Sequence, residues 1–259
     1  MDLRRRIPKS LYITRHLNSI KIFKKNTLVS DIKHKKNDSL LSLMLRHTHR
    51  LLRTSSYLQK SAHFLQTSIT ILKSKKDVHA VLSLYEENAH NLNAIHLANI
   101  YGTLAQNVKG PRLQKLKSDS RFTLLFENTI AKLQTSPSSF GARAIATITH
   151  SVGKMRFSDQ RFFDVVSNLR ERIVKEGEVQ TMSNVCWAFA TNGHRAEELF
   201  GLVAGEHERI AKEGKTQELS NTCWAFAKVD IQAEELFNSV ANEHERIARD
   251  GKVQVSERS

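Results

Sequence analysis

The sequence predicts an all-α fold, an α-α superhelix (solenoid) of two-helix repeats of about 37 residues. Three observations predict it: a gapless internal repeat, apolar residues spaced three and four positions apart, and only 3 prolines and 10 glycines in 259 residues. The sequence contains no convincing run of the alternating polarity that is typical of β-strands.

The repeat covers residues 177–213 and 214–250, which share 22 of 37 positions. Both copies contain Ser-Asn-x-Cys-Trp-Ala-Phe-Ala, then Ala-Glu-Glu-Leu-Phe, then Glu-His-Glu-Arg-Ile-Ala, and a further cycle begins after residue 250. Apolar residues in the first part of each copy predict one amphipathic helix, and those over 199–211 predict a second continuous helix. A single copy cannot cover both apolar stripes, whereas stacked copies can.

Weaker versions of the pattern extend upstream and define the other expected elements. Further helices are expected over residues 40–52, 58–72, 78–85, 94–106, 121–133, 140–152 and 162–173, with an enlarged loop over 109–120. Gly177, Gly214 and Gly251 follow the second helix of each cycle, where they are expected to form left-handed C-terminal caps.

The charge distribution divides the chain. Residues 1–76 hold 18 Lys or Arg and 3 Asp or Glu, whereas residues 77–259 hold 22 and 23. We therefore expect a basic leader (1–36), an irregular helical region (37–76), a helical-repeat domain (77–254) and a tail (255–259). The leader resembles an organelle presequence, which predicts a mitochondrial or, alternatively, a plastid location; the other interpretation is a basic arm that contacts polyanions.

The sequence contains no motif of the common catalytic or cofactor-binding classes. The His-Glu pairs at His207 and His244 lack the second histidine of a zinc helix, because Ala211 and Ala248 stand four positions on. We therefore expect no enzyme activity, no cofactor and no metal site. No apolar run is long enough to predict a membrane span.

The two cysteines, Cys186 and Cys223, occupy the same position in successive copies and are interpreted as small buried apolar residues. Trp187 and Trp224 follow them. Stacking on nucleic-acid bases is one interpretation of these indoles, and core packing is the one we favour.

RNA recognition is the remaining candidate chemistry, because helical repeats can present polar side chains to single-stranded bases. Polar residues of the first helices are candidates for base contact, although side chains near a helix start also cap the helix or face water; they are Thr181, Ser183, Asn184, Ser220, Asn221 and Thr222. Basic residues are candidates for phosphate contact, or else part of a solvated loop; they are Lys109, Arg112, Lys115, Lys117, Arg121, Arg143, Lys154 and Arg156. Glutamates of the second helices are expected to repel RNA.

The Asn-x-Cys-Trp-Ala-Phe-Ala motif in a 37-residue cycle resembles the octotricopeptide and heptatricopeptide repeats of organelle proteins. Residues 93–105 resemble the region that precedes such repeats in RAP-domain and FAST-kinase-like proteins, and the chain is similar to the repeat subunit of the RNA-editing substrate-binding complex. The resemblance covers about residues 77–254. It implies an α-solenoid that binds single-stranded organelle RNA, with protein partners in a ribonucleoprotein complex. We identify no RAP domain, so nuclease activity is not implied. A HEAT-like protein-binding scaffold is the alternative.

Overall fold

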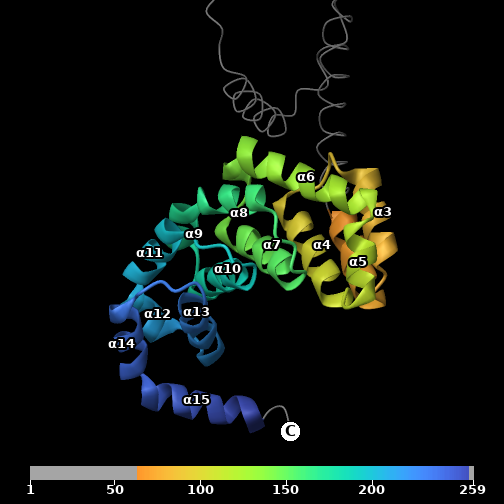
Figure 1. Ribbon diagram of the computed structural model, residues 1–259. Coiled ribbons are helices and arrows are strands. Elements are labelled where there is room, and N and C mark those ends of the chain that lie inside the picture. Colours follow the sequence, from red (N-terminus) through yellow and green to blue (C-terminus); the bar gives the residue numbers. More distant parts are fainter. Residues whose placement is uncertain (1–62, 257–259) are drawn as a thin grey trace, which may run out of the picture. The chain divides into compact units, whose positions relative to one another are not determined.

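The computed structural model describes residues 63–256, and the side chains of residues 63–250 (Figure 1). Every described residue belongs to one compact unit, which begins at residue 59. The basic leader, the expected helix over 40–52 and most of the tail lie outside the described residues.

All regular elements between residues 63 and 256 are helices, which confirms the all-α prediction. A series of helices lies, one after another, along the inner side of this unit in Figure 1. The series comprises α4 (Ala94–Asn107), α7 (Ala142–Lys154), α10 (Val179–Thr191) and α13 (Thr216–Lys228).

The remaining helices cover the opposite side of this series in Figure 1. They are α3 (Val78–Asn88), α6 (Ser120–Thr135), α8 (Gln160–Ser167), α9 (Arg170–Glu176), α11 (Glu197–Gly205), α12 (His207–Glu213) and α14 (Glu234–Asn242). The helix α15 (His244–Ser256) extends from the end of α14 below α13 in Figure 1. A helix over residues 63–75 adds Leu65 and Ile69 to the same core, so the packing begins before the expected boundary at residue 77.

The helices of the first series pack in parallel. The Ser183 hydroxyl donates to the carbonyl oxygen of Glu218 at 2.9 Å, which joins α10 to α13. A Cβ atom on Gly153 would lie 2.8 Å from the Cβ atom of Ala188, so α7 and α10 approach closely. Each helix pair has a second contact that advances along the chain in the same sense, His150 with Trp187 for α7 and α10, and Val179 with Gly214 at the starts of α10 and α13. Neighbouring helices α7, α10 and α13 therefore run in the same direction.

The second helix of each copy was predicted to be continuous, and this prediction is wrong. It is divided at Glu206 into α11 and α12, and at Glu243 into α14 and α15. The break lets Arg209 donate to the carbonyl oxygens of Val174 (2.7 Å) and Gly177 (3.2 Å) in the preceding copy. The apolar periodicity runs across the break, and for this reason the sequence did not reveal it.

The expected glycine caps are also wrong where the structure describes them. Gly177 and Gly214 have extended backbones, with φ of −89° and −69°. They are required for close packing instead, because a Cβ atom on either would lie within 2.7 Å of a neighbouring atom. Gly251 lies inside α15 and ends no helix. The expected loop over 109–120 contains the short helix α5 (Pro111–Lys117).

Candidate nucleic-acid interface

The exposed sides of α7, α10 and α13 form one surface, which we call the first-helix face. Its members recur every 37 residues. All of them are exposed or half-buried, and none is acidic. They are Arg143, Thr147, His150 and Lys154 on α7; Gln180, Asn184, Trp187 and Thr191 on α10; and Gln217, Asn221, Trp224 and Lys228 on α13.

These positions are spaced four, three and four residues apart, which places them on one side of each helix. Because the three helices are parallel and adjacent, equivalent members form rows that cross the helices. One row consists of Thr147, Asn184 and Asn221, and an aromatic row beside it consists of His150, Trp187 and Trp224.

The aromatic row is partly open to solvent. The rings of His150 and Trp187 have centroids 5.0 Å apart, and the Trp224 indole is 45% exposed. Core packing was the favoured interpretation of both tryptophans; for Trp224 it is wrong, because nearly half of its side chain is exposed. An exposed indole offers a flat surface to a nucleobase.

His150 contributes a neutral ring to the row. Burial, with a smaller contribution from the nearby Lys154 ammonium, lowers the pKa of the His150 imidazole to about 4. The ring is therefore uncharged at neutral pH, so the cations of the face are Arg143, Lys154 and Lys228.

The face does not continue unchanged onto α4. Asn99 occupies the place of Asn184 there, and its amide donates to the Gln66 side chain in helix 63–75 at 3.1 Å. This amide is thus occupied within the protein. The amides of Asn184 and Asn221 are half-buried and lie on the face.

The other predicted base-contacting residues do not belong to the face. Thr181, Ser183 and Thr222 are 6%, 1% and 1% exposed, respectively, so they are inaccessible to a ligand. The Thr222 hydroxyl donates to the Glu218 carbonyl oxygen at 2.8 Å. Ser220 is exposed, but it is the equivalent of Ser183, whose hydroxyl contacts the next helix of the first series. Ser220 therefore lies on that side of α13 and not on the first-helix face.

The predicted basic cluster divides into free and engaged cations. Lys109, Arg112 and Lys115 are exposed on α5 and the segment before it. Arg121 is held by Asp119 at 2.7 Å and by the Ser83 hydroxyl, which removes it from the set of free cations.

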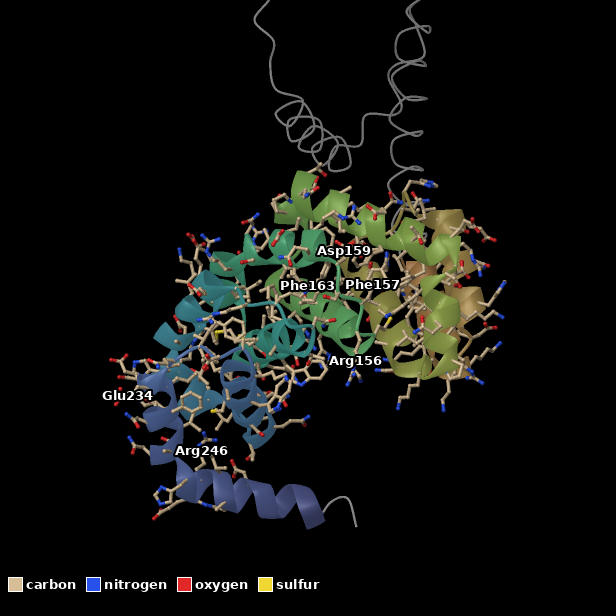
Figure 2. The ribbon with its side chains drawn as sticks, in the orientation of Figure 1. Arg156, Phe157, Asp159, Phe163, Glu234 and Arg246 are labelled. Carbon is tan, nitrogen blue, oxygen red and sulfur yellow. The ribbon has the colours of Figure 1, made fainter. Side chains whose placement is uncertain are left out.

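The turn after α7 is the second part of this basic region. Lys117 donates to the Arg156 carbonyl oxygen at 3.0 Å and lies 5.7 Å from the centroid of the Phe157 ring, which attaches α5 to this turn. Arg156 is exposed and lies near the middle of the view in Figure 2. Exposed cations of α5 and of the α7 end therefore adjoin the first-helix face.

The second helices carry exposed glutamates that pair with cations. Glu197, Glu198 and Glu208 have side chains about three-quarters exposed, at 73%, 73% and 72%, and they pair with Arg195, Arg170 and Lys212, respectively. The members of the first-helix face include three cations and no acidic residue. A polyanion would therefore be attracted to the first-helix face.

A cavity of about 470 Å³ lies between α8 and the α10–α11 turn, next to His194. The His194 ring stacks on Phe163 with centroids 4.0 Å apart, and desolvation lowers its pKa. Gln160 donates its amide to Asp164, so its carbonyl oxygen must accept from Nδ1 of His194. Nε2 then accepts from the Ser158 hydroxyl. Both ring nitrogens of His194 are therefore occupied by hydrogen bonds within the protein.

The two cysteines are free thiols in different surroundings. Cys186 is fully buried, and desolvation raises its pKa to about 12, as predicted for a buried apolar residue. Cys223 is only half-buried, so the same prediction is wrong for it. The described residues contain no group of three His, Cys, Asp or Glu side chains placed to share a metal ion. None of the described helices combines the length and apolarity needed to cross a bilayer.

Comparison of the chain with models of known protein families and with curated proteins found no match. The members of the face that the sequence analysis missed are Thr147, His150, Gln180, Thr191, Gln217 and Lys228. The 37-residue interval could have identified them, because residues 150, 187 and 224 are equivalent positions in successive repeats, as are residues 154, 191 and 228.

Proposed function

We propose that the chain binds single-stranded RNA along the first-helix face. The observation that carries this proposal is the set of parallel rows on α7, α10 and α13, in which amides, aromatic rings and cations recur without an acidic residue. Aromatic rings stack on bases of any sequence, amides pair with base edges, and cations contact phosphates.

We further propose that the repeats form an α-α superhelix over about residues 77–254, in which each second helix is broken in two. This architecture supports RNA binding because it extends the same rows from one copy to the next. The resemblance to octotricopeptide-type repeats and to RAP-related organelle proteins supports the same assignment and suggests a role in RNA processing, stability, editing or translation. The basic leader supports a mitochondrial or plastid location.

The decisive experiment alters the face without altering charge. In the full chain, the double variant Asn221→Ala with Trp224→Ala removes one amide and one exposed ring. We expect at least a tenfold weaker binding of single-stranded organelle transcripts, because one base stack alone is worth about 1–3 kcal/mol. Fluorescence anisotropy at moderate salt measures it, since nonspecific contacts by the basic N-terminal residues weaken there.

Leu202→Ala is the matched control, because Leu202 is a 40% exposed apolar residue on α11, away from the face. This variant should bind like the unaltered chain. Equal affinities for the double variant, the control and the unaltered chain would contradict the proposal.

The exposed glutamates of α11 and α12 favour a second candidate function, a HEAT-like scaffold for protein partners in a ribonucleoprotein complex. That function predicts that charge reversal at Glu197 and Glu208 abolishes assembly while RNA affinity is retained. RNA binding predicts the reverse outcome for the face variants.

A further inference from the structure

Exposed cations gather at the C-terminal ends of the first-series helices, and we call this group the C-terminal edge. We propose that the sugar-phosphate backbone of the bound RNA follows the C-terminal edge, crossing the helices, with its bases directed toward the helix N-termini. This inference rests on the proposed RNA binding and adds the path of the strand to it. The members of the edge are Lys109, Arg112, Lys115, Lys154, Arg156 and Lys228.

The helices of the first-helix face present their groups in one order. On α13 the Asn221 amide comes first, the Trp224 indole follows three residues later, and Lys228 ends the helix four residues after that. On α7 a hydroxyl, a ring and a lysine follow in the same order at Thr147, His150 and Lys154. The order is thus a hydrogen-bonding group, an aromatic ring and a cation.

This order matches the parts of one nucleotide. The hydrogen-bonding edge of a base points away from its sugar and phosphate, so a base that lies on Trp224 with this edge toward Asn221 directs its phosphate toward Lys228. Four residues of helix advance about 6 Å along the axis, a step that a ribose can span. The opposite orientation would place the phosphate beside the amide and the base edge beside the ammonium group.

The cations of the edge are free to bind phosphate. All six are exposed, and none forms an ion pair with another of the described residues 63–250. Lys117 joins α5 to the turn after α7, because it donates to the Arg156 carbonyl oxygen at 3.0 Å. The cations of α5 therefore lie beside those at the end of α7 and extend the edge in that direction.

The N-terminal ends of the same helices mix the two signs of charge. Glu178 precedes α10 at the place where Lys215 precedes α13, and both are exposed. Arg143 is the cation of the first-helix face at this end. At the C-terminal end, Asp230 follows α13 at the place of Arg156 after α7, so the positive charge of the edge is greatest at α7. A phosphate backbone is attracted most strongly to that end of the helices.

Lysines in the last turn of a helix have a second effect. They stabilise the helix itself, because its C-terminal end carries partial negative charge. This effect concerns folding and does not change the number of counterions that RNA releases on binding. Measuring both stability and salt dependence on the same variants therefore separates the two roles of Lys154 and Lys228.

Two matched double variants of the full chain test the proposal. Lys154→Gln with Lys228→Gln removes cations from the C-terminal ends of α7 and α13, and Arg143→Gln with Lys215→Gln removes as many from their N-terminal ends. Fluorescence anisotropy with a labelled single-stranded organelle transcript gives the slope of log K against log salt concentration. The first variant should make this slope shallower by about 1.4, at about 0.7 for each lost phosphate contact, and the second should leave it unchanged. The basic leader is common to all proteins, so its contribution cancels.

Equal slopes for the two double variants, or a larger change with the N-terminal pair, would overturn the proposal. So would a loss of stability in urea for Lys154→Gln with Lys228→Gln without a change of slope, since the lysines would then serve the helices alone. The variant Asn221→Ala with Trp224→Ala identifies which inference fails. If it binds weakly while the slopes are equal, only the path of the backbone is wrong; if it binds like the unaltered chain, RNA binding along the face is wrong as well.

Discussion

At the scale of single residues, one backbone geometry recurs with three different side chains. Arg156, Gly193 and Asp230 follow α7, α10 and α13 with φ of 46°, 74° and 55°. In each case the next residue donates its amide to the carbonyl five positions earlier, as Phe157 does to Val152 at 3.2 Å. This is the Schellman arrangement, in which glycine avoids the Cβ penalty of the left-handed region.

Arg156→Gly is therefore expected to affect stability and RNA affinity in opposite directions. Removing the Cβ atom at positive φ should raise the free energy of unfolding by about 0.5–1 kcal/mol. Loss of an exposed cation beside the first-helix face should weaken RNA binding and reduce its salt dependence. Urea denaturation and anisotropy measure the two effects.

Gly193→Ala is the control for the backbone effect, and it should lower the free energy of unfolding by about 1 kcal/mol. An increase in stability with this alanine, or a decrease with Arg156→Gly, would contradict the backbone explanation.

His150 predicts a dependence of stability on pH. Its pKa is about 4 in the folded chain, below the unperturbed value near 6.5, because the charged ring is poorly solvated. The unfolded chain thus binds more protons between these values, so stability is fully present above pH 6.5 and falls as the pH approaches 4. Lowering the pH from 7.5 to 5 should cost about 2 kcal/mol through this residue.

His150→Gln should remove that part of the loss, measured by urea denaturation at both pH values. Other histidines, including His194, titrate in both proteins, so the difference between the two profiles isolates His150. If the stability of His150→Gln and of the unaltered chain changed equally with pH, burial of the neutral His150 ring would not contribute to the pH dependence.

At the scale of elements, arginines at 37-residue intervals connect successive copies. Arg172 donates to the carbonyl oxygens of Pro137 and Phe140, Arg209 to those of Val174 and Gly177, and Arg246 to those of Ala211 and Gly214. Each guanidinium supplies donors to carbonyls at the end of the preceding unit. Such carbonyls have no intrahelical partner and need an external donor.

Arg209→Met is expected to lower the free energy of unfolding by about 1–3 kcal/mol, because it leaves the carbonyls of Val174 and Gly177 without their donor in a half-buried place. Chemical denaturation measures this change.

Arg195→Met removes a guanidinium that pairs with the exposed Glu197, and it should change stability by less than about 0.5 kcal/mol. Similar losses for Arg195→Met and Arg209→Met would indicate that the carbonyl contacts contribute nothing specific.

At the scale of the whole molecule, net charge is concentrated outside the repeats. Residues 1–76 have an excess of 15 positive charges, and residues 77–259 have one more acidic than basic residue. Within the repeats, the first-helix face carries cations and no acidic residue, whereas α11 carries the two exposed glutamates Glu197 and Glu198. Specific RNA contacts are therefore expected from the arrangement of the repeats and not from their net charge.

The basic leader is expected to direct the chain to an organelle. A fluorescent protein fused behind residues 1–36 should accumulate in mitochondria or plastids, because the membrane potential draws basic amphipathic segments inward. Replacing the eleven Lys and Arg residues of this segment with Gln should leave the fusion in the cytosol. Retention of the organelle signal by the neutral leader would contradict this interpretation.

The amino-acid sequence by itself determined the helical class and the 37-residue period, because apolar spacing and composition are local properties. It also indicated the amides of Asn184 and Asn221 as surface candidates. Only the tertiary structure decided which of the equivalent residues are buried. Ser183 is buried because α13 packs on it, whereas Ser220, the same amino acid in the next repeat, is exposed. The breaks at Glu206 and Glu243 were likewise decided by contacts between copies. Burial and long-range hydrogen bonds depend on packing partners, and a residue's own sequence surroundings do not contain them.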